Sequence, residues 1–128
     1  MFGGRGFEQE QLAQWSQGKQ DVHNMAGLYS MDDELRLMGL LDVMVTMDSA
    51  NMHLASLVET PVVSVWGATH PFAGFYGWGQ DSKSAVQVDL ECRPCSVFGN
   101  KTCHRGDFAC MQLISPKMLI HKINDIVN

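Results

Sequence analysis

The sequence predicts a three-layer α/β protein in which helices cover both faces of a parallel sheet. Short runs rich in β-branched residues alternate with segments of helical periodicity, an order that favours strand–helix–strand crossovers. The two central runs, VMVTM at 43–47 and PVVSVW at 61–66, are mostly apolar, as in strands buried on both faces. A chain of 128 residues suits one folded domain and is too short for two complete cores.

Strands and helices are expected to alternate along the chain. The expected strands end near Gly4 and Ala26, span 43–47 and 61–66, and recur at 85–90. The expected helices span 8–17, 31–40, 49–58 and 115–128. Parallel strands in this order place the residues that follow 43–47 and 61–66 at one edge of the sheet.

Glycines and a helix cap delimit the elements of the first forty residues. The glycine pair at 3–4 is typical of a strand that enters a tight loop, and Gly18 is placed to end the first helix. Ser30 stands three residues before Asp33, which is the spacing of a capping box and marks the start of the second helix.

Prolines and glycines delimit the later elements in the same way. Pro61 prevents the third helix from continuing, and Gly67 ends the strand that follows. Residues 91–110 carry all four cysteines and are expected to form a loop. Ser115 and Pro116 combine a helix cap with a first-turn proline, so an amphipathic helix is expected to begin there.

Charge and hydropathy argue against several classes of partner and location. The net charge is −5 and no block of like charges occurs, so a basic nucleic-acid-binding face is not expected. The apolar runs are far shorter than the roughly 20 residues that span a membrane. No secretion signal is recognisable, which favours a cytoplasmic location. The glycine pair so close to Met1 suggests a chain that begins within a fold.

Polar residues gather immediately after the two central strands. Those after the first strand are Asp48, Ser49, Ala50, Asn51 and His53, and those after the second are Gly67, Thr69 and His70. Ligands of open α/β sheets bind at this edge, where helix N-termini present free N–H groups, so the amides of 49–51 are expected to hold a diphosphate. In the alternative interpretation Asp48 or Ser49 is only a helix cap, and His53 is a hydrogen-bonded histidine of the core.

The chain also resembles a known family. The stretch MDSANMHLASLVETPVVSVWGATHP at 47–71 resembles the D-[ST]-[GA]-x-x-H-x-A and P-V-[VI]-x-[LV]-[WFY]-G-x-T-x-P motifs of the heptosyltransferase-like glycosyltransferases of family nine. FGGRGFE at 2–8 is similar to the family's glycine-and-glutamate segment, and the cysteine-rich stretch at 92–116 is similar to the ends of many members. The family commonly has glycine where Ala50 stands, and a methyl group should be tolerated there.

This resemblance implies a Rossmann-like parallel sheet, the C-terminal half of a two-domain GT-B enzyme. Residues 1–128 would form part of the nucleotide-sugar-binding domain, with a cysteine-rich loop at 91–110 and a terminal helix at 115–128. The family's N-terminal domain supplies the acceptor site and the general-base carboxylate, and neither is expected in this sequence. The fragment alone is therefore expected to bind its donor weakly and to be inactive.

The resemblance also implies roles for individual residues. Asp48 and the amides of Ser49 and Ala50 would contact the sugar and the diphosphate, and Glu8 would lie near the nucleoside ribose. His53 would lie half-buried beneath the phosphate-binding turn as a positioning or charge-stabilising residue. The residues lining the cleft that faces the N-terminal domain would be Gly67, Thr69 and His70.

The implied reaction is the inverting transfer of a sugar to an acceptor. In the best-known case of the family, heptose passes from an ADP-heptose donor to the lipopolysaccharide core, and no metal is needed because dipoles and side chains stabilise the departing diphosphate. Such an enzyme would be cytoplasmic and peripheral to the inner face of the inner membrane. An alternative function is a non-catalytic α/β module whose cysteine loop binds a metal or a partner.

The four cysteines, Cys92, Cys95, Cys103 and Cys110, lie within nineteen residues of one another. The Cys-Arg-Pro-Cys knuckle has the local spacing of a tetrahedral zinc site, which predicts a structural zinc ion. Two disulfides are one alternative, although a cytoplasmic protein seldom keeps them, and free thiols are another. In each case the role would be to fix a long loop.

Overall fold

The computed structural model describes residues 1–4 and 6–128. The chain divides into two units, Met1–Leu37 and Met38–Asn128, and each is described by itself. The first unit contains helix α1 (Phe7–Ser16) and all but the last residue of helix α2 (Met31–Met38). The second unit contains the sheet and the remaining helices.

The two helices of the first unit confirm the sequence prediction, with ends that differ by one or two residues. Ser30 caps α2 as expected: the amide of Asp33 donates to Ser30 Oγ at 3.3 Å, and that hydroxyl donates to Asp33 Oδ2 at 2.7 Å. Gly39 follows directly after the end of α2. These helices form where local sequence signals and helical periodicity agree.

The two strands expected in the first unit are wrong. The segments run side by side, since the Met25 amide donates to the Met1 carbonyl at 2.9 Å and the Met1 amino group donates to the His23 carbonyl at 2.5 Å. No strand is present in residues 1–4 or 21–27. Asn24 accepts a hydrogen bond from the amide of Ala26 at 3.1 Å, and this local side-chain bond competes with strand pairing.

The second unit is built on three parallel strands in the order β1-β2-β3. Strand β1 (Met44–Met47) pairs with β2 (Val62–Val65), and β2 pairs with β3 (Ala85–Val86). Both central strands are confirmed. The strand expected at 85–90 is wrong beyond Val86, because the Val88 carbonyl accepts a hydrogen bond from the side chain of Arg93 instead of a strand partner.

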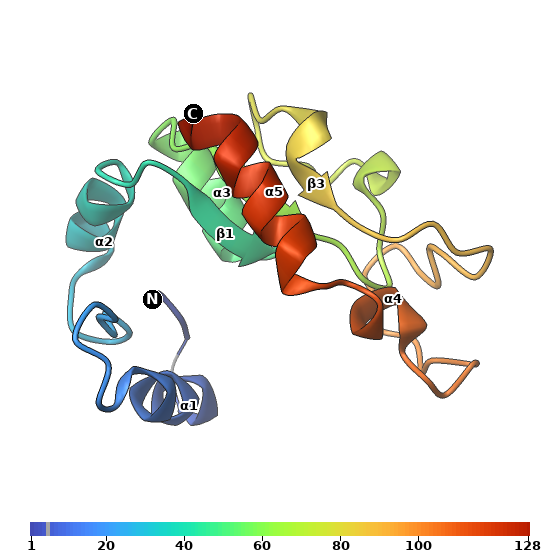
Figure 1. Ribbon diagram of the computed structural model, residues 1–128, viewed down its shortest axis with the longest axis horizontal. Helices are drawn as coiled ribbons and strands as arrows, with labels where there is room; N and C mark the ends of the chain where they lie inside the picture. The colour runs from blue at the N-terminus through green and yellow to red at the C-terminus, as the bar shows by residue number, and fades with distance from the viewer. Residues whose placement is uncertain (5) are drawn as a thin grey trace. The chain divides into compact units, whose positions relative to one another are not determined.

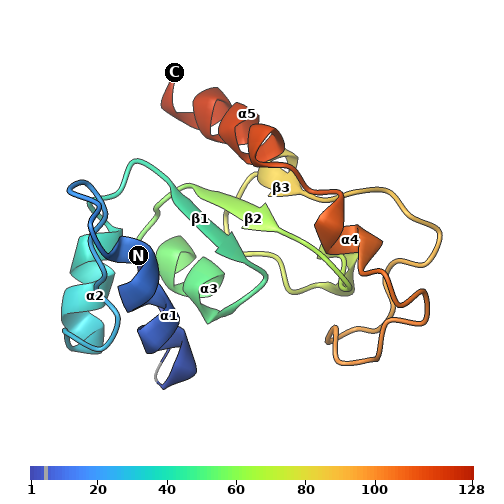
Figure 2. The ribbon, with the colours of Figure 1, turned by 60° about the horizontal axis from the view of Figure 1, so that its bottom comes forward.

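Helices α3 (Ala50–Leu57) and α5 (Pro116–Val127) lie on opposite faces of the sheet (Figures 1 and 2). All four residues of β2 are buried, as expected for a strand covered on both sides. The three-layer arrangement predicted from the sequence is therefore confirmed for this unit.

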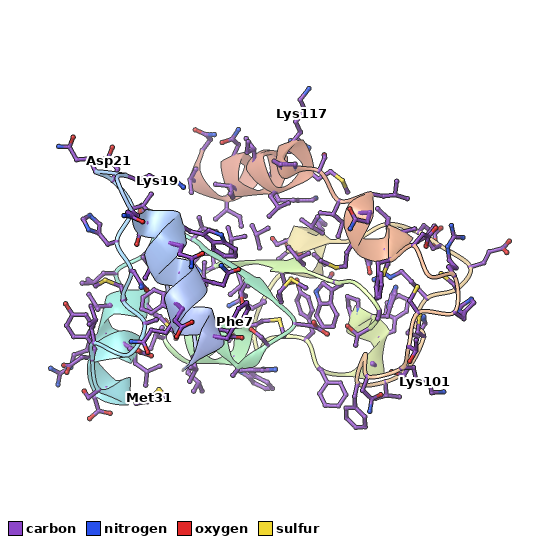
Figure 3. The ribbon with its side chains drawn as sticks, turned by 90° about the horizontal axis from the view of Figure 1, so that it is seen from below. Phe7, Lys19, Asp21, Met31, Lys101 and Lys117 are labelled. Atoms are coloured by element: carbon purple, nitrogen blue, oxygen red, sulfur yellow. The ribbon has the colours of Figure 1, made fainter. Side chains whose placement is uncertain are left out.

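The core between the sheet and α5 is apolar. Its buried centre is Val63, Val65 and Val86, and the α5 residues packed on it are Met118, Leu119, Ile123 and Ile126. Lys117, at the start of α5, points away from the sheet (Figure 3). The amphipathic helix predicted from Ser115-Pro116 is thus formed and directs its apolar face to the core.

The turns after β2 and the helix before α5 were not predicted. They are the 3₁₀ helices Pro71–Ala73 and Ser82–Ser84 and the short helix α4 (Ala109–Gln112). The segment between β3 and α4 lies beyond the carboxyl ends of β1 and β2 (Figure 2). Among the described residues, no helix has the length and apolar composition needed to cross a membrane.

Candidate functional site

The ends of β1 and β2 meet at one edge of the sheet, where the sequence analysis places the site. Asp48 follows β1 directly, and the hydroxyl of Thr69, four residues beyond β2, donates a hydrogen bond to Asp48 Oδ2. Thr69 is only 8% exposed, whereas Asp48 is half-buried. The prediction that Asp48 and Thr69 lie at the same edge of the sheet is confirmed. Among the described residues, this carboxylate uses only Oδ2 in hydrogen bonds.

Ser49 does not cap helix α3 with its side chain. Its Oγ lies 3.0 Å from Oγ1 of Thr46, the third residue of β1. Its amide donates to the Met47 carbonyl at 2.9 Å, so that N–H is already engaged within the turn. The alternative in which Ser49 is a side-chain helix cap therefore does not describe this turn.

The amides that face outward at the start of α3 are those of Ala50 and Asn51. N–H groups of a first helical turn have no acceptor within the helix, and the helix dipole makes this end electropositive. Ala50 is exposed and Asn51 is half-buried. Of the three amides considered from the sequence, two are therefore placed to donate to an anion.

His53 is exposed, so both expectations of burial for this histidine are wrong. Helix α3 turns Met52, Ala55 and Ser56 toward the interior. His53 and Leu57 are four residues apart and share the outer face, on which Leu57 is 72% exposed. The imidazole is thus available to solvent and is not part of the core.

Gly67 permits a close approach between the loop after β2 and helix α4. A Cβ atom built on Gly67 would lie 2.5 Å from Sδ and 3.1 Å from Cγ of Met111. Gly67 is also buried. An alanine here would therefore force the Met111 side chain to move.

His70 shapes the loop through its ring nitrogen. Nδ1 accepts a hydrogen bond from the Phe72 amide at 3.1 Å and caps the 3₁₀ helix Pro71–Ala73. The ring is tilted against Phe72 with centroids 4.5 Å apart. With Nδ1 occupied, Nε2 is the imidazole atom left for another partner.

The buried aromatic side chain below this loop is structural. Trp66 is fully buried, donates from Nε1 to Ser64 Oγ at 2.8 Å, and stacks on Tyr76 with ring centroids 5.8 Å apart. The Tyr76 hydroxyl donates to the Asp81 carbonyl at 2.8 Å, and burial raises the pKa of Tyr76. These contacts give the loop a rigid base.

Arg93 is a residue of this edge that the sequence analysis missed. Its guanidinium donates to backbone carbonyls of the loop after β2 from a position more than twenty residues later in the chain. Burial lowers the pKa of Arg93, which still carries a charge at neutral pH. The sequence signal was its place between two cysteines, but only the folded loop shows what it contacts.

Glu8 lies in the first unit, on α1. It is exposed, and its Oε2 accepts a hydrogen bond from the Gly4 amide at 2.8 Å. This contact joins the start of the helix to the glycine pair in front of it.

The four cysteines are all free thiols, and Cys110 is the buried one. Among the described residues, no three His, Cys, Asp or Glu side chains converge as a metal site. Burial raises the pKa of Cys95, whereas backbone hydrogen bonds, foremost from Phe108, lower the pKa of Cys103. The structural zinc ion stays a prediction.

A cavity of about 660 Å³ lies away from this edge, near the amino ends of β2 and β3. Its lining combines apolar side chains with charged ones, among them Ile126, Glu59, Asp81, Lys83 and Lys122. Ligands of open α/β sheets bind at the carboxyl ends of the strands, and the motif residues Asp48 and Thr69 meet there, so we favour that edge over this cavity as the functional site.

Comparisons with known proteins place the chain in a family. The sequence profile of glycosyltransferase family 9 (heptosyltransferase) matches residues 1–104. Lipooligosaccharide heptosyltransferase 2 of Campylobacter jejuni subsp. jejuni serotype O:6 (strain 81116 / NCTC 11828) is 26% identical over 105 residues, which cover 82% of this chain and 32% of that protein. The chain thus spans about a third of the length of this relative. No solved structure matches the chain significantly. The chain belongs to glycosyltransferase family 9, the heptosyltransferase family, whose members have the GT-B fold.

Proposed function

We propose that this chain is the donor-binding part of an inverting heptosyltransferase, with the nucleotide sugar held at the carboxyl edge of β1 and β2. The hydrogen bond between Thr69 and Asp48 carries the proposal, because it joins the two motif segments beside free amides of α3. Membership of family 9 supports a nucleotide-sugar donor as the ligand. We propose ADP-heptose as that donor.

Each group at the edge has a role that suits its chemistry. The Oδ1 atom of Asp48 accepts hydrogen bonds from sugar hydroxyls, while Thr69 holds Oδ2 in place. The amides of Ala50 and Asn51 donate to the diphosphate, whose charge the electropositive helix end favours. Ser49 supplies its hydroxyl from the same turn. The Ser49 amide already donates to the Met47 carbonyl, so only the amides of Ala50 and Asn51 donate to the diphosphate.

The remaining motif residues complete the donor site. His53 is exposed and offers its ring to the phosphates from the outer face of α3. Gly67 and His70 shape the loop beside the sugar, and His70 presents Nε2 to it.

The reaction is a displacement at the anomeric carbon of the donor sugar. An acceptor hydroxyl attacks that carbon, the bond to the diphosphate oxygen breaks, and the configuration is inverted. A general base outside this chain takes the hydroxyl proton, and the electropositive end of α3 stabilises the charge that develops on the diphosphate. This chain's own residues therefore bind and orient the donor and stabilise the leaving group.

The acceptor is the lipopolysaccharide core, bound by a domain outside this chain. The curated relative is a lipooligosaccharide heptosyltransferase, which supports an acceptor of this kind. The enzyme acts in the cytoplasm at the inner face of the inner membrane.

The test is heptose transfer by the full-length protein with an Asp48→Ala variant. Wild type should release ADP from ADP-heptose in the presence of a core acceptor, and Asp48→Ala should reduce kcat/KM about ten- to a hundredfold, the loss of one charge-assisted hydrogen bond. Asp42→Ala is the matched control, because Asp42 is an exposed aspartate just before β1. An inactive wild type, or an Asp48→Ala enzyme as active as the control, favours the non-catalytic module instead.

A further inference from the structure

The side chain of Arg93 donates five hydrogen bonds, all to neutral oxygens. The acceptors are the backbone carbonyls of Trp66, Gly67, Thr69 and Val88 and the side-chain amide oxygen of Gln87. A guanidinium group has five N–H donors in a planar fork, so it can hold several carbonyls at once. Its partners all precede it in the chain and come from two segments, the loop after β2 and the segment after β3.

Residues 66–69 are held through four consecutive carbonyl oxygens. Arg93 contacts those of Trp66 at 3.1 Å, Gly67 at 2.5 Å and Thr69 at 3.0 Å. The amide of Cys95 donates to the remaining one, on Ala68, at 2.8 Å. Beyond the end of β2 these carbonyls have left the sheet, and the segment 93–95 takes the place of a neighbouring strand.

The same loop residue that Arg93 holds by its carbonyl also holds Asp48 by its hydroxyl. The path runs from the guanidinium to the Thr69 carbonyl, and from Thr69 Oγ1 to Asp48 Oδ2. Because Thr69 is nearly buried and its backbone is fixed, its hydroxyl has a defined direction. Arg93 thereby sets the position of the Asp48 carboxylate indirectly, through Thr69.

We infer that Arg93 is a positioning residue of the donor site, which fixes the loop 66–69 so that Thr69 holds Asp48 in the orientation that binds the sugar. This inference rests on the proposed function. Lysine cannot replace it, because an ammonium group is a point charge whose three donors do not form a planar fork.

The first experiment measures two quantities in the full-length protein: amide hydrogen exchange, which reports on the loop 66–69, and the KM for the donor. Arg93→Lys keeps the charge and is expected to speed hydrogen exchange of the Cys95 amide, which donates to the Ala68 carbonyl, about tenfold. It is also expected to raise the KM for ADP-heptose about ten- to a hundredfold. The KM for the acceptor should stay within twofold. Arg105→Lys is the matched control, an exposed arginine of the same cysteine-rich loop, and should change neither quantity.

The second experiment tests the path through Thr69. Thr69→Val removes the hydroxyl that donates to Asp48. If Arg93 acts through this hydroxyl, adding Arg93→Lys to Thr69→Val should raise the donor KM less than twofold further. If the double variant raises the donor KM by the product of the two single-variant effects, the inference is overturned.

Failure of the inference differs from failure of the proposed function. A wild type that neither binds nor uses ADP-heptose refutes the function, whereas hydrogen exchange still reports on the loop. Unchanged exchange in Arg93→Lys, or faster exchange with an unchanged donor KM, overturns the inference while the function stands. If Arg93→Lys does not fold, Gln87→Met, which removes one acceptor, should give smaller changes in the same directions, and their absence overturns the inference.

Discussion

The hydrogen bond between Thr69 and Asp48 should be measurable as a coupling energy. Asp48→Ala leaves the Thr69 hydroxyl, on a residue only 8% exposed, without its acceptor, which costs about 1–3 kcal/mol. Thr69→Val leaves a half-buried carboxylate without its donor, at a similar cost. Replacing both partners removes the unsatisfied groups, so the double variant should be at least about 1.5 kcal/mol more stable than the sum of the single effects predicts.

Urea denaturation of wild type, the two single variants and the double variant measures this coupling. Each single variant should also melt several degrees lower, at about 4 °C for each kcal/mol. Heptose transfer should respond differently: the double variant regains stability but not activity, since the carboxylate is absent. Stability effects that add within about 0.5 kcal/mol, or a double variant with wild-type transfer, would refute the reasoning.

Three further predictions concern the loops around the site. Gly67→Ala brings a Cβ to 2.5 Å from Met111 Sδ and should lower the free energy of unfolding by about 1–3 kcal/mol, partly recovered by Met111→Ala; equal stability in urea would contradict this packing. Cys103, with its lowered pKa, should react with iodoacetamide before Cys95, whose pKa burial raises, as followed by mass spectrometry; the reverse order would contradict the assignment, and bound zinc would protect both thiols. The Arg105 guanidinium lowers the pKa of Asp107 from 3.8 to about 2, so the pair contributes stability above pH 3.8 that is lost as the pH falls through about 2. Arg105→Gln should return the Asp107 midpoint toward 3.8 in a carboxyl NMR titration, and an unchanged midpoint would argue against the ion pair.

The elements predicted most closely are those whose local pattern and burial agree. Strands β1 and β2 and helices α3 and α5 lie within one residue of their expected bounds at both ends. The failures have local causes. The Asn24 side chain accepts a hydrogen bond from the Ala26 amide, and after Val86 the Val88 carbonyl accepts one from Arg93. Neither cause is visible in hydropathy.

At the site, topology was a better guide than residue type. The rule that parallel strands end at one edge predicts that Asp48 and Thr69 share that edge, and the structure joins them there by a hydrogen bond. The same rule does not predict which residues of α3 face solvent, and His53 is exposed. Nor does it predict the turn in which the Ser49 amide donates to the Met47 carbonyl. Arg93 escaped detection because its contacts span 24 to 27 residues across a loop without periodicity.

The hydrogen bonds that hold the loop 66–69 have a consequence for how the sequence of this chain can change in evolution. Arg93 and the Cys95 amide donate hydrogen bonds only to main-chain carbonyl oxygens of that loop, which every amino acid possesses. The side chain at position 68 can therefore change without breaking these hydrogen bonds. Selection for a different ligand can thus sample new side chains at this position on an unchanged backbone, so long as position 93 stays arginine.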